Sequence, residues 1–100
     1  MSVPAIRQTD IFSKWLGGLA DSRARAKITA RIDRLAHSNS GDVAPVGEGV
    51  NESRIHFGPG YRVYFAARGQ AVVILLCGGD KSTQAKDIKP AKHLARGLEE

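Results

Sequence analysis

The sequence lacks the disulfides and zinc sites that usually stabilise small exported domains, and it lacks the long apolar runs that anchor proteins in membranes. Its single cysteine, Cys77, cannot form an internal disulfide, and no Cys/His cluster has the spacing of a zinc site. The longest apolar run, residues 71–77, is far shorter than the roughly 20 residues that a membrane span requires. Residues 1–10 carry no apolar signal-peptide core. We therefore expect a cytoplasmic protein with no membrane segment, no metal site and no cofactor.

Acidic side chains are also few relative to basic ones, although the overall composition is that of a folded domain. The chain has 100 residues, of which 42% are hydrophobic and 25% charged, which argues against disorder and fibrous folds. This length predicts a single domain over residues 1–100. Fifteen Lys and Arg against ten Asp and Glu give a net charge of +5, which favours a polyanionic partner.

Apolar spacing in the first part of the chain predicts a weak strand over residues 3–8 and two amphipathic helices. The first helix begins at Thr9 or Asp10, and the second begins at Asp21 or Ser22 and extends to Ala36. Residues 39–51 read as a loop with a short extended stretch at 43–46. Basic residues lie largely off the apolar stripe of the second helix: Arg23, Lys27, Arg31 and Arg34.

Alternating apolar residues on both sides of a Gly-Pro-Gly turn predict a β-hairpin from residues 53–57 and 61–65. If residues 58–60 form the loop, His56 pairs with Arg62 and Arg54 pairs with Tyr64. These four side chains then project together, away from the core.

The remaining segments are expected to complete the sheet and add a last helix. Residues 71–77 are apolar throughout, as in a central strand covered on both faces. The pair Gly78-Gly79 is expected to end that strand in a flexible turn. A helical turn then begins at Ser82 or Thr83, and Pro90 suits the first turn of the last helix.

The predicted outer face of the hairpin concentrates groups that suit RNA phosphodiester cleavage. His56 can accept and donate a proton, while Arg54, Arg62 and Lys81 can stabilise charge that develops on phosphorus. An ordinary solvated sheet surface is the alternative for any one of these residues taken alone. Residues placed to bind RNA, by stacking or by charge, are Tyr64, Gln84, Lys86 and Lys89.

Three segments, residues 52–65, 75–84 and 87–89, resemble the RelE/ParE superfamily of bacterial toxins, and within it the HigB-like, phage Gp49-like branch of addiction module killer proteins. The resemblance implies a RelE-like α+β fold, with a small, mainly antiparallel sheet, two N-terminal helices packed on one face and a short C-terminal helix. It also implies an endoribonuclease that cuts mRNA in the ribosomal A site, contacts ribosomal RNA and is neutralised by a cognate antitoxin, a HigA-like helix-turn-helix protein.

Site residues follow from the same resemblance. Arg54 and His56 occupy strand positions where relatives place basic catalytic residues. Arg62 matches the arginine with which relatives hold the scissile phosphate. Lys81 matches a basic residue that stabilises charge or protonates the leaving oxygen.

Two other functions are compatible with the pattern. The ParE branch shares the fold and inhibits DNA gyrase without nuclease chemistry, and fold alone does not separate the two branches. A catalytically inert member would only bind an antitoxin or RNA. Some relatives use a tyrosine near the C-terminus, but no aromatic residue follows Phe65 here, so that catalytic role is either vacant or taken by His56, Gln84 or a lysine.

Overall fold

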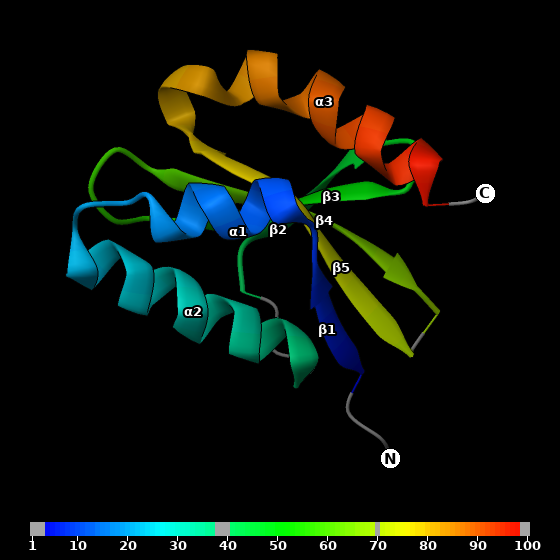
Figure 1. The fold of residues 1–100 in the computed structure, drawn as a ribbon, viewed down its shortest axis with the longest axis horizontal. Helices are drawn as coiled ribbons and strands as arrows, with labels where there is room; N and C mark the ends of the chain where they lie inside the picture. The colour runs from blue at the N-terminus through cyan, green and yellow to red at the C-terminus, as the bar shows by residue number, and fades with distance from the viewer. Residues whose placement is uncertain (1–3, 38–40, 70, 99–100) are drawn as a thin grey trace.

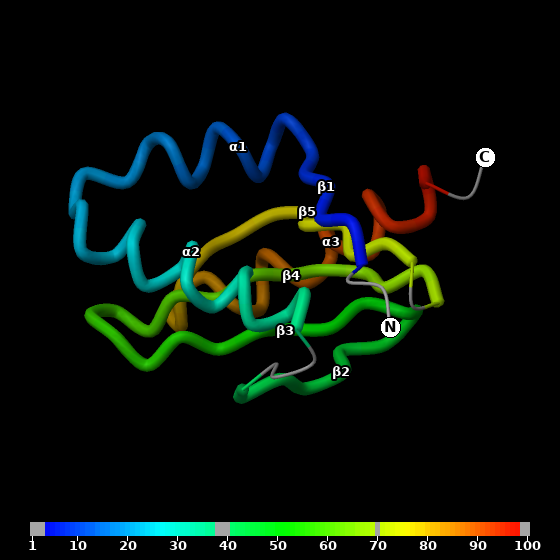
Figure 2. The backbone as a smooth tube through the Cα atoms, turned by 90° about the horizontal axis from the view of Figure 1, so that it is seen from below, coloured from blue at the N-terminus to red at the C-terminus, as the bar shows by residue number. Residues whose placement is uncertain are grey.

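Five strands form one mixed sheet with helices on both of its faces (Figure 1). The computed structural model describes residues 4–37, 41–69 and 71–98. The order across the sheet is β1-β5-β4-β3-β2, and Figure 2 shows the last four side by side. β1 pairs with β5 in parallel, and every other pair is antiparallel, so the predicted α+β class is confirmed. The strands are β1 (Ala5–Gln8), β2 (Val43–Gly47), β3 (Val50–Ile55), β4 (Tyr61–Arg68) and β5 (Val72–Asp80).

The two N-terminal helices begin at predicted caps and cover one face of the sheet. α1 (Asp10–Gly17) is capped by the Thr9 side chain, and α2 (Ser22–Ala36) by the Asp21 carboxylate. Their apolar residues pack against strand residues that point the same way. Together they form the larger core cluster, which contains Phe12, Ile28, Leu35, Ile55, Val63, Phe65, Val73 and Leu75. Within the described part of the chain, no helix is long and apolar enough to cross a membrane.

The last helix, α3 (Gln84–Gly97), is longer than expected and covers the opposite face of the sheet (Figure 1). It follows the short 3-10 helix η1 (Lys81–Thr83) directly, so Pro90 lies inside it and not in its first turn. Ala91 and Ala95 are buried against the sheet, and this packing offsets the backbone hydrogen bond that proline removes. The face that the sequence predicts to be open is therefore largely occupied.

The hairpin has a different register from the predicted one. Arg54 pairs with Arg62 and Glu52 pairs with Tyr64. The expected pairs of His56 with Arg62 and of Arg54 with Tyr64 are wrong because the loop spans residues 56–60. Within it, the Gly60 amide donates to the Phe57 carbonyl at 3.1 Å, and Gly58 and Gly60 both have positive φ. His56 thus lies in the loop and not in a strand.

The pair Gly78-Gly79 belongs to β5, which continues to Asp80, and does not form the expected turn. The Trp15 ring lies against Gly78 from one side, while the Asp87 carboxylate lies against Gly79 from the other. A Cβ atom at either glycine would collide with these groups. The glycines therefore let both helical layers approach the strand backbone closely.

The first two strands differ from expectation mainly at their ends. The extended stretch predicted at 43–46 is confirmed as β2, and β3 begins at Val50 after a turn in which Glu48 has a φ of 55°. The expected first strand is confirmed as β1 from Ala5 to Gln8. Its predicted start at Val3, like part of the predicted loop at 39–40, lies outside the described residues.

Candidate functional site

An open cleft at the tip of the β3–β4 hairpin brings together two of the predicted catalytic residues. The cleft has a volume of about 360 Å³ and is lined by His56, Lys81 and loop residues 57–60. The Lys81 amide donates to the Pro59 carbonyl at 3.4 Å, which ties the start of η1 to the hairpin loop. The His56 side chain is 71% exposed, so it is accessible to a large substrate.

Asp42 orients the imidazole of His56. Its Oδ2 atom lies 2.7 Å from Nε2 of His56, and its backbone carbonyl accepts from the Arg54 amide at 2.8 Å. The hydrogen bond from His56, supported by the charge of Arg54, lowers the pKa of the Asp42 carboxyl. An ionised Asp42 favours the tautomer with the proton on Nε2, which leaves the Nδ1 lone pair to accept a proton.

Glu52 is a fully buried carboxylate beneath α3, and no role is predicted for it from the sequence. It accepts hydrogen bonds from Arg54 Nε at 2.9 Å and from Gln84 Nε2 at 2.7 Å. Burial acts to raise the pKa of Glu52, but these two hydrogen bonds and the charge of Arg62 outweigh it, so the pKa is lowered. This network joins β3, β4 and the first turn of α3.

Arg62 and Tyr64 lie beneath α3, so the prediction that they face outward is wrong. Arg62 is 8% exposed and Tyr64 is fully buried. Burial, followed by the charge of Glu52, raises the pKa of the Tyr64 phenol. Among the described residues, neither Arg62 Nε nor Tyr64 Oη has a hydrogen-bond partner. A base cannot stack on Tyr64, and a phosphate cannot reach Arg62 Nε, without displacing α3.

The other residues predicted to bind RNA do not gather at the hairpin tip. Gln84 belongs to the buried network, where it donates to Glu52. Lys86 and Lys89 are exposed on α3 and line a separate cleft of about 630 Å³, whose wall includes Ile11 of α1. The fold thus divides the predicted site into an exposed pair, a buried network and two lysines at a separate cleft.

Signals for the missed residues are weak in the sequence. Asp42 lies 14 positions before His56 in an irregular segment, so no local spacing connects them. Glu52 stands two residues before Arg54 on the same face of a strand, a pattern typical of an exposed ion pair as well as a buried one.

Comparison with known proteins places this chain in a family. The family described as "Phage derived protein Gp49-like (DUF891)" matches residues 14–98. An uncharacterized protein of Haemophilus influenzae is 55% identical over 93 residues, which cover 93% of this chain and 94% of that protein. The chain therefore belongs to the Gp49-like family, and the match includes the hairpin, Asp42 and Lys81.

Proposed function

We propose that the protein is the toxin of a type II toxin-antitoxin pair and an endoribonuclease that cuts mRNA in the ribosomal A site. The observation that carries this proposal is the Asp42–His56 hydrogen bond at an exposed cleft that also contains Lys81. Membership of the Gp49-like family supports this proposal. We group the Gp49-like proteins with the HigB-like branch of the RelE/ParE superfamily, which the sequence resembles.

The chemistry we assign to this cleft is transesterification at phosphorus: the neighbouring 2′-oxygen forms a new bond to phosphorus, and the bond from phosphorus to the 5′-oxygen breaks. Nδ1 of His56 accepts the proton of the 2′-hydroxyl while the 2′-oxygen attacks phosphorus, and Asp42 stabilises the resulting imidazolium. The Lys81 ammonium neutralises the phosphate and donates a proton to the departing 5′-oxygen. The products are a 2′,3′-cyclic phosphate and a 5′-hydroxyl, and positive charge comes from side chains without a metal ion.

Arg54 has a different role in this scheme from the phosphate contact that the sequence suggests. Its guanidinium donates to Glu52 at 2.9 Å and lies 3.7 Å from Oδ1 of Asp42. These two carboxylates already neutralise its charge. We therefore assign Arg54 as a positioning residue that holds Asp42, and through it His56, at the cleft.

The partners in this proposal follow from the mechanism and the charge. The substrate is mRNA held by the ribosome, and ribosomal RNA provides the anionic surface that a net charge of +5 favours. A HigA-like helix-turn-helix antitoxin neutralises the toxin in the cytoplasm. An adjacent reading frame encoding such a protein, and its co-purification with this chain, would support the pairing.

The direct test is mRNA cleavage in a purified translation system, followed by primer extension and analysis of the fragment ends. Wild-type protein should cut in register with the reading frame and leave cyclic-phosphate and 5′-hydroxyl ends. The His56→Ala variant should cut roughly 10²-fold more slowly or worse, because a proton-transfer group acts mainly in the transition state.

His93→Ala is the matched control, since His93 is also exposed but lies on α3 in the other cleft. This variant should cleave at the wild-type rate. If His56→Ala also cleaves at the wild-type rate, His56 is not the base. If wild-type protein leaves transcripts intact and instead stops supercoiling by DNA gyrase, the ParE-like function replaces the one proposed here.

A further inference from the structure

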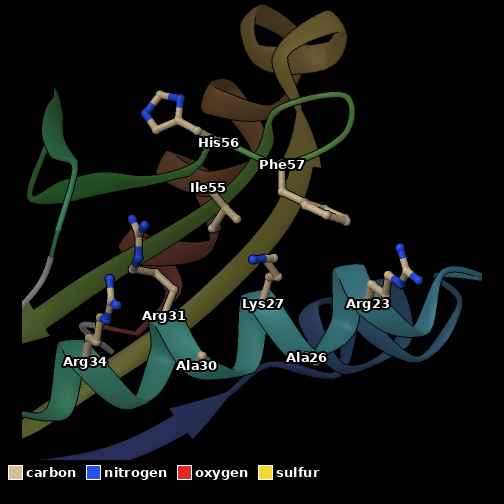
Figure 3. Close-up of a pocket in the computed structure, with 9 residues that line it drawn as sticks. All are labelled: Arg23, Ala26, Lys27, Ala30, Arg31, Arg34, Ile55, His56 and Phe57. Carbon is tan, nitrogen blue, oxygen red and sulfur yellow. The ribbon is translucent and has the colours of Figure 1, made fainter.

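A second cleft opens between α2 and the hairpin, on the other side of His56. It has a volume of about 540 Å³, with Ile55 and Phe57 on the hairpin side and His56 at its edge (Figure 3). His56 and Phe57 line both this cleft and the one containing Lys81, so the two clefts adjoin at the hairpin tip. The basic side chains that line the α2 side are Arg23, Lys27, Arg31 and Arg34.

The α2 side of this cleft carries positive charge that α2 itself does not balance. The helix contains five basic residues and a single acidic one, Asp33. Like charges one turn apart, such as Arg23, Lys27 and Arg31, destabilise a helix by a few tenths of a kcal/mol per pair, roughly. None of the described residues that line the cleft is acidic. A bound polyanion would remove this repulsion.

Two of the basic side chains are held in place against the hairpin. Arg31 Nη1 donates to the Arg54 carbonyl at 2.6 Å. Lys27 Nζ lies 5.4 Å from the centre of the Phe57 ring, a cation–π contact. Figure 3 shows Lys27 and Phe57 directed into the space between α2 and the hairpin. The cleft thus combines ordered cations with an aromatic ring, as single-stranded nucleic acid sites do.

We propose that this cleft binds the backbone of a single RNA strand and leads it to His56, an inference that rests on the proposed function. Cations repeat along α2 about once per turn, or roughly every 6 Å, a spacing comparable with that of phosphates in an extended strand. An acidic polypeptide would also match the charge. RNA is favoured because the cleft adjoins the proposed cleavage site at His56, past which a substrate strand must run.

The test is binding of a short fluorescent single-stranded RNA with 2′-O-methyl riboses, which lacks the nucleophile and cannot be cut. Anisotropy titrations over a range of salt concentrations would compare wild-type protein with Arg23→Gln/Lys27→Gln. Loss of two phosphate contacts should weaken binding about tenfold or more and reduce the slope of log affinity against log salt by about 1.4. Melting temperature should stay close to wild type, because Arg23 and Lys27 are exposed.

Lys86→Gln/Lys89→Gln is the matched control, because it also lowers the net charge of +5 by two but acts at the other cleft. It should bind nearly as wild type and keep most of the salt slope. Equal effects of the two double variants, or none from Arg23→Gln/Lys27→Gln, would overturn the inference. The inference would also be overturned if Arg23→Gln/Lys27→Gln lost binding to poly-glutamate, an acidic polypeptide, while its binding to RNA stayed unchanged. Because binding is measured without cleavage, failure of the nuclease proposal would be seen separately, as RNA that binds at α2 but is not cut on ribosomes.

Discussion

Replacing Glu52 with Gln removes one buried negative charge with little change of shape. Gln keeps an oxygen that accepts a hydrogen bond, but it removes the carboxylate that pairs with Arg54 at 2.9 Å and whose charge acts on Arg62, which is 8% exposed. Glu52 is fully buried but Arg54 is 36% exposed, so the figure for a hydrogen bond to a charged group, about 1.5–3 kcal/mol, applies here. We expect a loss of about 2 kcal/mol, which in a domain of this size lowers the melting temperature by roughly 8–16 °C.

The same substitution should show a characteristic pH dependence. The pKa of Glu52 is lower in the folded protein than its ordinary value of 4.5, so ionised Glu52 stabilises the fold above that value. This stabilisation is lost as the pH falls through the folded-state pKa. A protonated Glu resembles Gln in shape, so the difference in stability between wild type and Glu52→Gln should be full at neutral pH and close to zero at sufficiently acidic pH.

Urea unfolding, followed by circular dichroism over a series of pH values, measures this difference. Glu48→Gln is the matched control, because Glu48 makes an exposed ion pair with Arg96 and should contribute less than about 1 kcal/mol. A difference for Glu52→Gln that keeps its size from neutral to acidic pH would refute the electrostatic reasoning. So would an equal loss in the two variants at neutral pH.

Three further substitutions test other parts of the structure. Gly79→Ala should cost about 1–3 kcal/mol in thermal melts, because its Cβ would collide with the Asp87 carboxylate, and unchanged stability would contradict that contact. Asp42→Asn should slow RNA cleavage about tenfold or more at an unchanged melting temperature, since it weakens support for the His56 imidazolium; full activity would remove Asp42 from the site. Cys77→Ser should keep full cleavage activity with a stability loss of about 1–3 kcal/mol, because burial raises the pKa of the Cys77 thiol to about 12 and leaves it unreactive. Slow alkylation of the native thiol by iodoacetamide would agree with this, and an inactive but folded variant would not.

Local patterns were enough to predict most of the elements and one face of the sheet. Alternation of apolar residues correctly predicted the two hairpin strands, and Ile55, Val63 and Phe65 lie together in the core because side chains at period two point to the same face. The caps of α1 and α2 were predicted for a similarly local reason, since each side chain bonds to amides within three residues.

A second covered face was predicted only along residues 71–77, and the helix that covers it could not be predicted in the same way. The buried side of α3 consists largely of small residues such as Ala91 and Ala95, which give a weak apolar stripe. Polar residues in alternating positions, such as Glu52 and Arg62, are usually exposed, but here α3 covers this face of the sheet and supplies Gln84 as a partner for Glu52. The sequence therefore predicted the exposed His56 and Lys81 as site residues but also placed the buried Arg62 and Tyr64 on an open surface.

The pairing of the first strand with the last has a consequence for the order in which the chain folds. β1 lies beside β5, and the Thr9 hydroxyl donates to the Leu76 carbonyl, 67 positions later. Such distant contacts form late, because the entropy of closing a long loop must be overcome first. During synthesis, β5 and Lys81 emerge after the other four strands. The cleft with both His56 and Lys81 therefore cannot assemble until β5 has been made and has paired with β1 and β4.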